Sequence, residues 1–234
     1  GWYALPHRVK SGATYRVAAW LRGRDVVWGE TRVPSQPLEA SITYDTLRHR
    51  VVNRWTDRPE EKNYYWLSYA TGVSTDNTRR PTHFSLPSYI ETNSTLADPF
   101  NRSFDFEEEI PAEYDYYVRV EDAGLSGERL ELEYRGDRSM YGYSLCEGQE
   151  DGYYVGVHFI LSLDGHYDHY LRSVITNREY AWDMDDLPLF YTPLWFYSNV
   201  TNGVGLVASY ARFADVEERV FYKKEEEPFD DLYD

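Results

Sequence analysis

Short runs in which apolar and polar residues alternate recur along almost the whole chain, and they limit the fold more than any other feature of the sequence. The clearest run is GERLELEYRG, with Leu130, Leu132 and Tyr134 at every second position and a glutamate after each leucine. Because neighbouring side chains of a β-strand point to opposite faces, this pattern predicts a strand with one buried face and one solvated face.

Comparable runs occur elsewhere, separated by turn-forming residues. Aromatic residues make up 17% of the chain, and such rings favour half-buried strand surfaces. We therefore predict an all-β protein. The expected strands lie at 13–21, 26–33, 38–45, 49–55, 63–71, 115–122, 127–136, 152–163, 203–213 and 218–222.

One segment has a different period. Tyr167, Tyr170, Leu171 and Val174 recur at the spacing of one helix face. We expect a single helix near residues 165–180.

The segment PSQP (34–37) divides the chain, because proline removes a backbone donor and restricts the residue before it. We place a domain boundary there. An N-terminal hairpin within residues 1–35 is expected to precede a larger β-sandwich or barrel-like domain at 36–225, and an acidic tail follows at 226–234. Within the larger domain, residues 72–104 show little periodicity and predict a long surface excursion.

The net charge of −16 bears on the class of partner. A nucleic acid and an anionic membrane surface would both be repelled, so neither is expected as a partner. The single cysteine, Cys146, excludes a disulfide within the chain, and no apolar run approaches the roughly 20 residues of a membrane-spanning helix. The chain begins without Met and almost at once becomes strand-like, so we expect its natural start to be missing, together with any targeting segment.

Two asparagines and two glycines gather between aromatic-rich runs in the segment SNVTNGVG. Asn202 and Gly203 form an Asn-Gly pair, a strong signal for a tight turn. Gly205 suggests a bulge or the close approach of another backbone, and Asn199 can bond the backbone of its own turn. We interpret all four as structural residues.

Aromatic residues that are adjacent in the sequence are the best candidates for contact with a ligand. Half of each group is expected in the core, and the other half at the surface, where a ring can stack on a sugar or a peptide. The ligand-binding candidates are Tyr64, Trp66, Tyr117, Tyr154, Trp195 and Tyr197.

Histidines on the expected helix suggest a metal site. His166 and His169 are three residues apart and share a helix face, so both could reach one ion, with His158 as a third ligand if the preceding strand brings it back. The alternative is a solvated helix start, with Asp164 as the N-cap.

Acidic clusters allow two further interpretations. Asp183, Asp185 and Asp186 form one cluster, and residues 107–109, all glutamate, form another. They could supply oxygen ligands for a structural calcium ion or the paired carboxylates of a hydrolase, although runs of acid are usually solvated faces. The chain has neither a G-x-S-x-G elbow nor a glycine-rich phosphate loop, so we assign no catalytic residue and no cofactor other than this calcium.

Four segments, spread from Gly12 to Tyr210, resemble motifs of one family in the same order. They are SGATYRVAAWLRGRDVVWGETRVP, WTDRPEEKNYYWLSY, LSLDGHYDHYLRSV and LWFYSNVTNGVGLVASY. The family is domain of unknown function 4249. The resemblance implies an outer-membrane lipoprotein of Bacteroidota, often encoded beside TonB-dependent transporters that import glycans, peptides or metal chelates. It also implies an N-terminal Ig-like domain, of which the hairpin would be a remnant, and it transfers no catalytic residue.

These observations lead to one expected function and two alternatives. We expect a surface-exposed, non-enzymatic lipoprotein that acts as an accessory or binding subunit of a TonB-dependent transporter or another outer-membrane complex. A lipid anchor outside this chain would hold it at the membrane. The alternatives are a hydrolase of glycans or peptides that uses Asp183 or Asp185, and a purely structural subunit that contacts protein through residues 72–104.

Overall fold

The computed structural model describes residues 7–45, 50–74, 84–86, 90–98, 117–136, 151–182 and 196–222. Cys146 and the acidic tail lie outside these residues. Within them the chain forms β-strands and one helix, which confirms the predicted all-β class. The elements are β1 (Thr14–Ala19), β2 (Val27–Arg32), β3 (Leu38–Asp45), β4 (Arg50–Thr56), β5 (Tyr64–Ser74), β6 (Ile90–Glu91), β7 (Val118–Glu121), β8 (Arg129–Gly136), β9 (Asp151–Leu163), α2 (Gly165–Trp182) and β10 (Tyr210–Tyr222).

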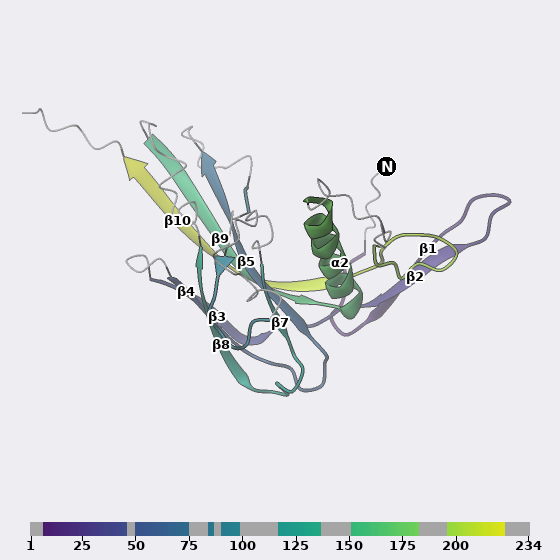
Figure 1. Ribbon diagram of the computed structural model, residues 1–234, viewed down its shortest axis with the longest axis horizontal. Helices are drawn as coiled ribbons and strands as arrows, with labels where there is room; N and C mark the ends of the chain where they lie inside the picture. The colour runs from purple at the N-terminus through teal and green to yellow at the C-terminus, as the bar shows by residue number, and fades with distance from the viewer. Residues whose placement is uncertain are drawn as a thin grey trace, which may run out of the picture.

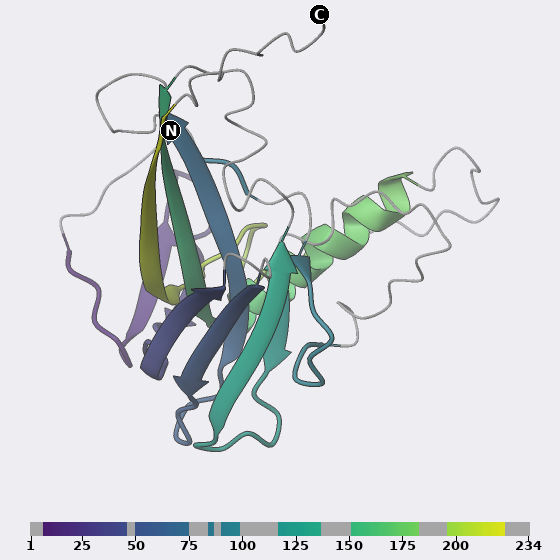
Figure 2. The same cartoon turned by 90° about the vertical axis from the view of Figure 1, so that its left-hand side faces the viewer.

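Two four-stranded antiparallel sheets pack as a sandwich (Figure 1). The strand order is β10-β9-β5-β7 in one sheet and β3-β4-β8-β6 in the other. Figure 2 shows the shorter strands of the second sheet in front of β5, β9 and β10. The sheets are linked at one edge, where the hydroxyl of Tyr44 on β3 donates to Asp215 on β10 at 3.0 Å. Neither sheet closes into a barrel within the described residues. Of the two architectures expected, the domain is therefore a β-sandwich.

The main core lies between these two sheets, and β8 shows how the sequence builds it. Leu130, Leu132 and Tyr134 are buried, whereas Glu131 is exposed. Their partners across the core include Tyr65 and other inward-facing residues of β5, β7 and β9. The alternation in the sequence therefore corresponds to the two faces of this strand.

Helix α2 packs on the outer face of the sheet that contains β5, at the end where β5 begins and β9 ends. Its apolar side packs on a cluster of Tyr64, Trp66 and Leu163. The intervening residues Tyr65 and Leu67 point into the sandwich core. Because β5 is buried on both faces, three aromatic residues can follow one another in it. In a strand with one solvent-exposed face, such a run would place at least one ring in water.

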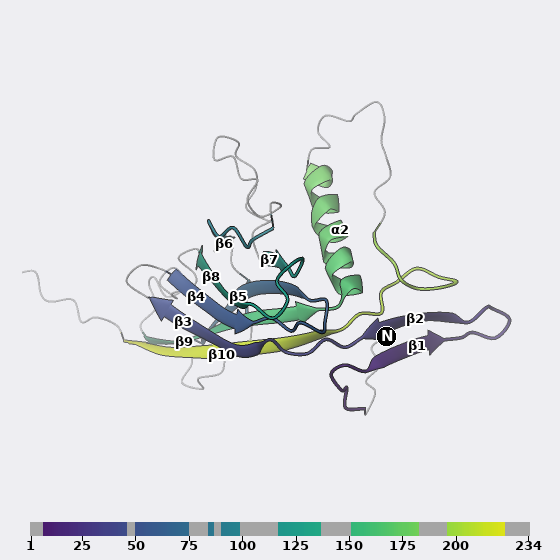
Figure 3. The same cartoon turned by 90° about the horizontal axis from the view of Figure 1, so that it is seen from below.

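The hairpin formed by β1 and β2 is a separate two-stranded sheet. Figures 1 and 3 show α2 between this hairpin and the sandwich. Much of β1 and its turn is exposed, including Val17, Trp20 and Leu21. The boundary at 34–37 and the Ig-like origin of the hairpin stay predictions. No helix among the described residues has both the length and the apolar character that crossing a membrane requires.

One strand begins later than the sequence suggested. We expected it to start near Gly203, but β10 begins at Tyr210, and residues 204–209 are not part of a strand. The backbone of Val207 is bonded by a side chain instead of a neighbouring strand. Its N–H donates to Oδ1 of Asn199 at 2.9 Å, and its carbonyl accepts from Nδ2 of the same residue at 2.7 Å.

Candidate functional site

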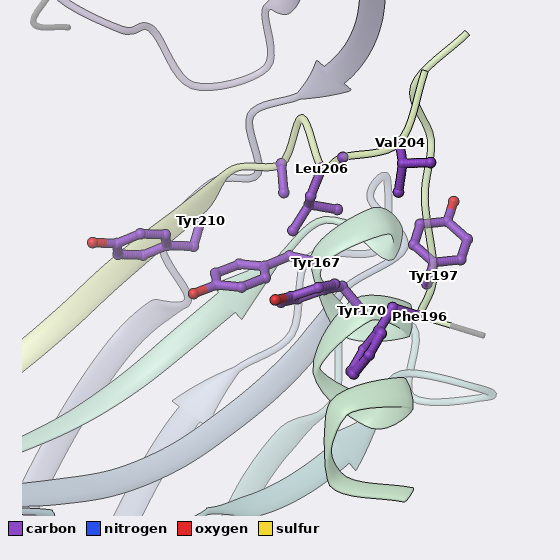
Figure 4. A pocket seen from close by; sticks show the side chains of 9 residues that line it. Tyr167, Tyr170, Phe196, Tyr197, Val204, Leu206 and Tyr210 are labelled. Atoms are coloured by element: carbon purple, nitrogen blue, oxygen red, sulfur yellow. The ribbon is translucent and has the colours of Figure 1, made fainter. Parts of the chain in front are cut away.

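A groove of about 620 Å³ opens between α2 and residues 196–210 (Figure 4), and we call it the tyrosine groove. Its volume lies within the usual range of small-molecule sites. Two of its rings are more than half exposed, Phe196 at 57% and Tyr210 at 54%. None of the described lining residues carries a formal charge. They are Tyr167, Tyr170, Phe196, Tyr197, Val204, Gly205, Leu206, Ala208 and Tyr210.

The start of α2 places two of these rings. Asp164 caps the helix as expected, because its Oδ1 accepts the backbone N–H of Tyr167 at 2.7 Å. The other carboxylate oxygen of Asp164 accepts from the hydroxyl of Thr31 on β2. Tyr167 and Tyr170 are three residues apart, so both point from the same helix face into the groove.

Asn199 holds the opposite wall of the groove in place. Besides its two bonds to Val207, its Nδ2 donates to the carbonyl of Glu30 on β2 at 3.0 Å. Trp28 and Thr201 exchange two backbone hydrogen bonds as an isolated antiparallel bridge, which attaches this wall to β2. The backbone N–H of Tyr197 also donates to Ser173 on α2 at 3.1 Å, which ties the wall to the helix.

The Asn-Gly pair forms the turn at the end of this wall. Asn202 has a φ of 59°, in the left-handed region that asparagine tolerates, and its Nδ2 donates to the carbonyl of Val26 at 3.1 Å. A Cβ at Gly203 would lie 2.8 Å from a methyl group of Val27. A Cβ at Gly205 would make only a 3.4 Å contact with Val200, so no close approach of another backbone is seen there, whereas its φ of 158° is a conformation that favours glycine.

A second close approach between the wall and the hairpin is at Gly29, a residue that sequence reasoning did not single out. A Cβ there would lie 2.8 Å from Cγ2 of Val207 and 3.2 Å from the carbonyl oxygen of Asn199. No local sequence signal marks this position, because the contact joins residues far apart in the chain.

The two histidines proposed as metal ligands meet at Tyr197. The Nδ1 of His166 lies 2.6 Å from the hydroxyl of Tyr197. The ring of His169 meets the ring of Tyr197 nearly edge-on, with the two centroids 5.3 Å apart. His158 is elsewhere, buried in the sandwich with its Nδ1 3.1 Å from the hydroxyl of Tyr134. Within the described part of the chain, no three His, Cys, Asp or Glu side chains are grouped as a metal site requires.

Two phenols of the groove, Tyr167 and Tyr197, have pKa values above the ordinary value. Burial raises the pKa of Tyr167, and the neighbouring Tyr210 and Tyr170 raise it further. Burial also raises the pKa of Tyr197, with a smaller contribution from the charge of Asp164. A neutral phenol both donates and accepts a hydrogen bond, so these groups suit a polar but uncharged ligand.

The structure separates the aromatic candidates. Tyr197 lines the groove, whereas Tyr64, Trp66 and Tyr154 are buried, the first two beneath α2. Tyr117 is half-buried and packs against the same cluster as Trp66. None of these four residues lines the groove. The strand faces that we expected to be exposed to solvent are covered. Trp195 lies outside the described residues.

Sequence reasoning did not assign four of the aromatic residues that line the groove, Tyr167, Tyr170, Phe196 and Tyr210. Tyr167 and Tyr170 indicate a helix face by their spacing, and Tyr210 falls within the strand expected at 203–213. The available signal was that a helix and a turn motif, both rich in rings, are close in the sequence. The acidic candidates Asp183, Asp185, Asp186 and residues 107–109 lie outside the described residues.

Comparison with known proteins bears on the family. Searches of curated proteins and of solved structures found no match. A family model described as Domain of unknown function (DUF4249) matches residues 1–214, which confirms the resemblance seen in the motifs. The chain therefore belongs to this family of unknown function.

Proposed function

We propose that this protein is a non-enzymatic binding subunit that captures a ligand in the tyrosine groove. It is held at the cell surface as an outer-membrane lipoprotein and docks on a TonB-dependent transporter or another outer-membrane complex. The family resemblance supports the location and the partner, and the groove supports the capture of a ligand.

The exposed rings of the groove are the observation that carries ligand capture. Phe196 and Tyr210 are more than half exposed, and Val204 beside them is 91% exposed. Burial of apolar surface is favourable by about 25 cal/mol per Å², so a ligand that covers these side chains gains binding free energy. Apolar surface gathered in a concave site commonly marks a binding site.

The groove also has the rigidity that a binding site needs. One wall is α2, which packs on the sheet, and the other is fixed to β2 and α2 by hydrogen bonds of Asn199 and Ser173. A pre-formed site loses less side-chain freedom when a ligand binds, which favours affinity.

Affinity purification from native membranes tests the partner. The tagged chain, solubilised in mild detergent, is expected to recover a β-barrel membrane protein in near-equal amount. Recovery of the chain alone, in repeated purifications, would contradict the proposal.

Groove variants test whether capture and docking use different surfaces. We expect Phe196→Ala to retain the barrel partner but to lose ligand affinity. Phe84→Ala is the matched control, because Phe84 is 51% exposed but lies beside Ser85, which pairs with Thr71 on β5, away from α2. Equal behaviour of the two variants in every binding assay would show that the groove is not the capture site.

A further inference from the structure

Three phenol groups form a row across the tyrosine groove. Tyr167 and Tyr170 come from α2, and Tyr210 from the first residue of β10. Figure 4 shows their rings one after another, with the three hydroxyl groups pointing to the same side. The rings of Tyr167 and Tyr210 have centroids 6.1 Å apart and are inclined by 46°. The groove therefore offers apolar ring faces beside a line of hydroxyl groups.

The charges of the protein restrict what can bind there. The described lining residues include no cation that would hold an anionic group and no carboxylate that would hold a cationic group. The chain as a whole carries a net charge of −16, which repels anions. Phenols are uncharged at neutral pH, so the tyrosines of the groove add no charge to it. The electrostatics thus favour a neutral ligand.

Strand addition by an extended peptide is blocked at one residue of the wall, Val207. A peptide that binds as an added strand needs free backbone N–H and C=O groups on its receptor. At Val207 both groups are already bonded to the side chain of Asn199. Strand addition at this residue would require those bonds to break.

We propose that the ligand of the tyrosine groove is a neutral glycan. This inference rests on the proposed function and names the ligand class of the same site. A sugar ring has an apolar C–H face that stacks on an aromatic ring, and it carries hydroxyl groups along its edge. In the groove, Phe196 and the tyrosine rings contact the sugar faces, while the phenols of Tyr167, Tyr170 and Tyr210 bond the sugar hydroxyls.

Calorimetric titration against three sets of probes tests the ligand class. The neutral set contains hexamers of β-1,4-glucose, α-1,4-glucose, β-1,4-mannose, β-1,4-galactose and β-1,4-xylose. The acidic set contains oligogalacturonate and chondroitin sulfate hexamers, and the third set is a pool of random hexapeptides. We expect at least one neutral series to bind, with an affinity that does not change between low and high salt.

Variants locate the binding and separate ring faces from hydroxyl groups. Phe196→Ala is expected to weaken binding about tenfold through the lost stacking surface, and Phe84→Ala is expected to leave it unchanged. Tyr210→Phe keeps the ring but removes the hydroxyl, and we expect it to weaken binding severalfold. Because Tyr210 is 54% exposed, this variant tests the hydroxyl without disturbing the core.

The failures of the two proposals can be told apart. If acidic hexamers or peptides bind and Phe196→Ala abolishes that binding, the groove captures ligand but the ligand is not a neutral glycan. If no neutral hexamer binds, or if Tyr210→Phe binds it as tightly as the wild type does, the inference is overturned. If light scattering shows self-association that Phe196→Ala abolishes, a second copy covers the groove, and both proposals fail.

Discussion

The carboxylate of Asp168 on α2 accepts two hydrogen bonds from the guanidinium of Arg119 on β7, at 2.7 Å from Nε and 2.8 Å from Nη2. Their side chains are 0% and 2% exposed. Trp66 donates to the same carboxylate at 2.8 Å, and Asp98 and Glu121 hold the other side of the guanidinium. Burial alone lowers the pKa of Arg119, but the bonds to Asp168 and the nearby carboxylates outweigh it and raise the pKa. The bonds to Asp168 join α2 to β5 and β7, and so hold one wall of the groove.

Loss of the arginine is expected to destabilise the fold severely. Arg119→Leu leaves Asp168 buried without its counter-charge, and breaking such a pair costs about 3–5 kcal/mol. We expect the free energy of unfolding in urea to fall by that amount. The control is Arg54→Leu, which breaks a partly exposed pair with Glu131 and should cost less than about 1 kcal/mol. Similar losses for both variants would mean that this cluster does not anchor the helix.

Asn199 is expected to hold the wall of the groove against the hairpin. Asn199→Ala removes the side-chain amide that bonds Glu30 and Val207, and it leaves their part-buried backbone groups without these partners. The expected cost is about 1–3 kcal/mol, with faster amide hydrogen exchange in β2.

A glycine at the neighbouring turn provides the comparison. Asn202→Gly keeps a residue that tolerates the positive φ and loses one exposed hydrogen bond, so the change should stay within about 0.5 kcal/mol. If exchange in β2 were as slow in Asn199→Ala as in the wild type, Asn199 would not be what joins the wall to the hairpin.

The sequence predicted where the strands and the helix lie along the chain better than it predicted how they pack on one another. Alternation located β8 and its buried face because Leu130, Leu132 and Tyr134 face a single core. It could not show that α2 covers the other face of β5, because burial of Tyr64 and Trp66 depends on a helix about 100 residues later in the chain. The ligand candidates chosen on strands were therefore partly core residues.

The groove was harder to predict for the same reason. Tyr167 and Tyr170 have the spacing of a helix face that packs on a core. No local sequence pattern shows that Tyr210 and Phe196 line a groove with them. Asn199 was recognised as a turn residue, but its bond to Glu30 spans 169 positions and depends on the packing of the hairpin. Local patterns specify which residues turn the chain, whereas tertiary contacts decide what those turns hold.

Gly29 is expected to accept no larger side chain while Val207 is present. In Gly29→Ala the new Cβ would lie 2.8 Å from Cγ2 of Val207, so the wall must move away from β2. Overpacking of this kind costs about 1–3 kcal/mol. The double variant Gly29→Ala/Val207→Ala should recover part of that loss, measured as a coupling energy in a double-mutant cycle. Strictly additive effects would show that the two residues do not press on each other.

Stability is expected to fall at alkaline pH because of buried phenols, with Tyr65 as the main example. Its hydroxyl donates to Asp57 at 2.7 Å, and burial together with this bond raises its pKa well above the ordinary value of 10.0. Below about pH 10 the phenol is protonated in both the folded and the unfolded chain, so its contribution to stability is fully present. As the pH rises further, only the unfolded chain releases the proton, and the free energy of unfolding decreases.

Tyr65→Phe separates this effect from other alkaline changes. At pH 7 the variant should be less stable by about 1–2 kcal/mol, because Asp57 loses one partner and keeps the backbone N–H of Gly127 at 3.0 Å. Between pH 9 and 11, which brackets the phenol's ordinary value of about 10, its free energy of unfolding should decrease less steeply than that of the wild type. The measurement is urea unfolding at each pH, with absorbance at 295 nm to follow phenol ionisation. Parallel curves for the two proteins would show that Tyr65 does not carry the alkaline loss, whereas converging curves assign it to this buried hydroxyl.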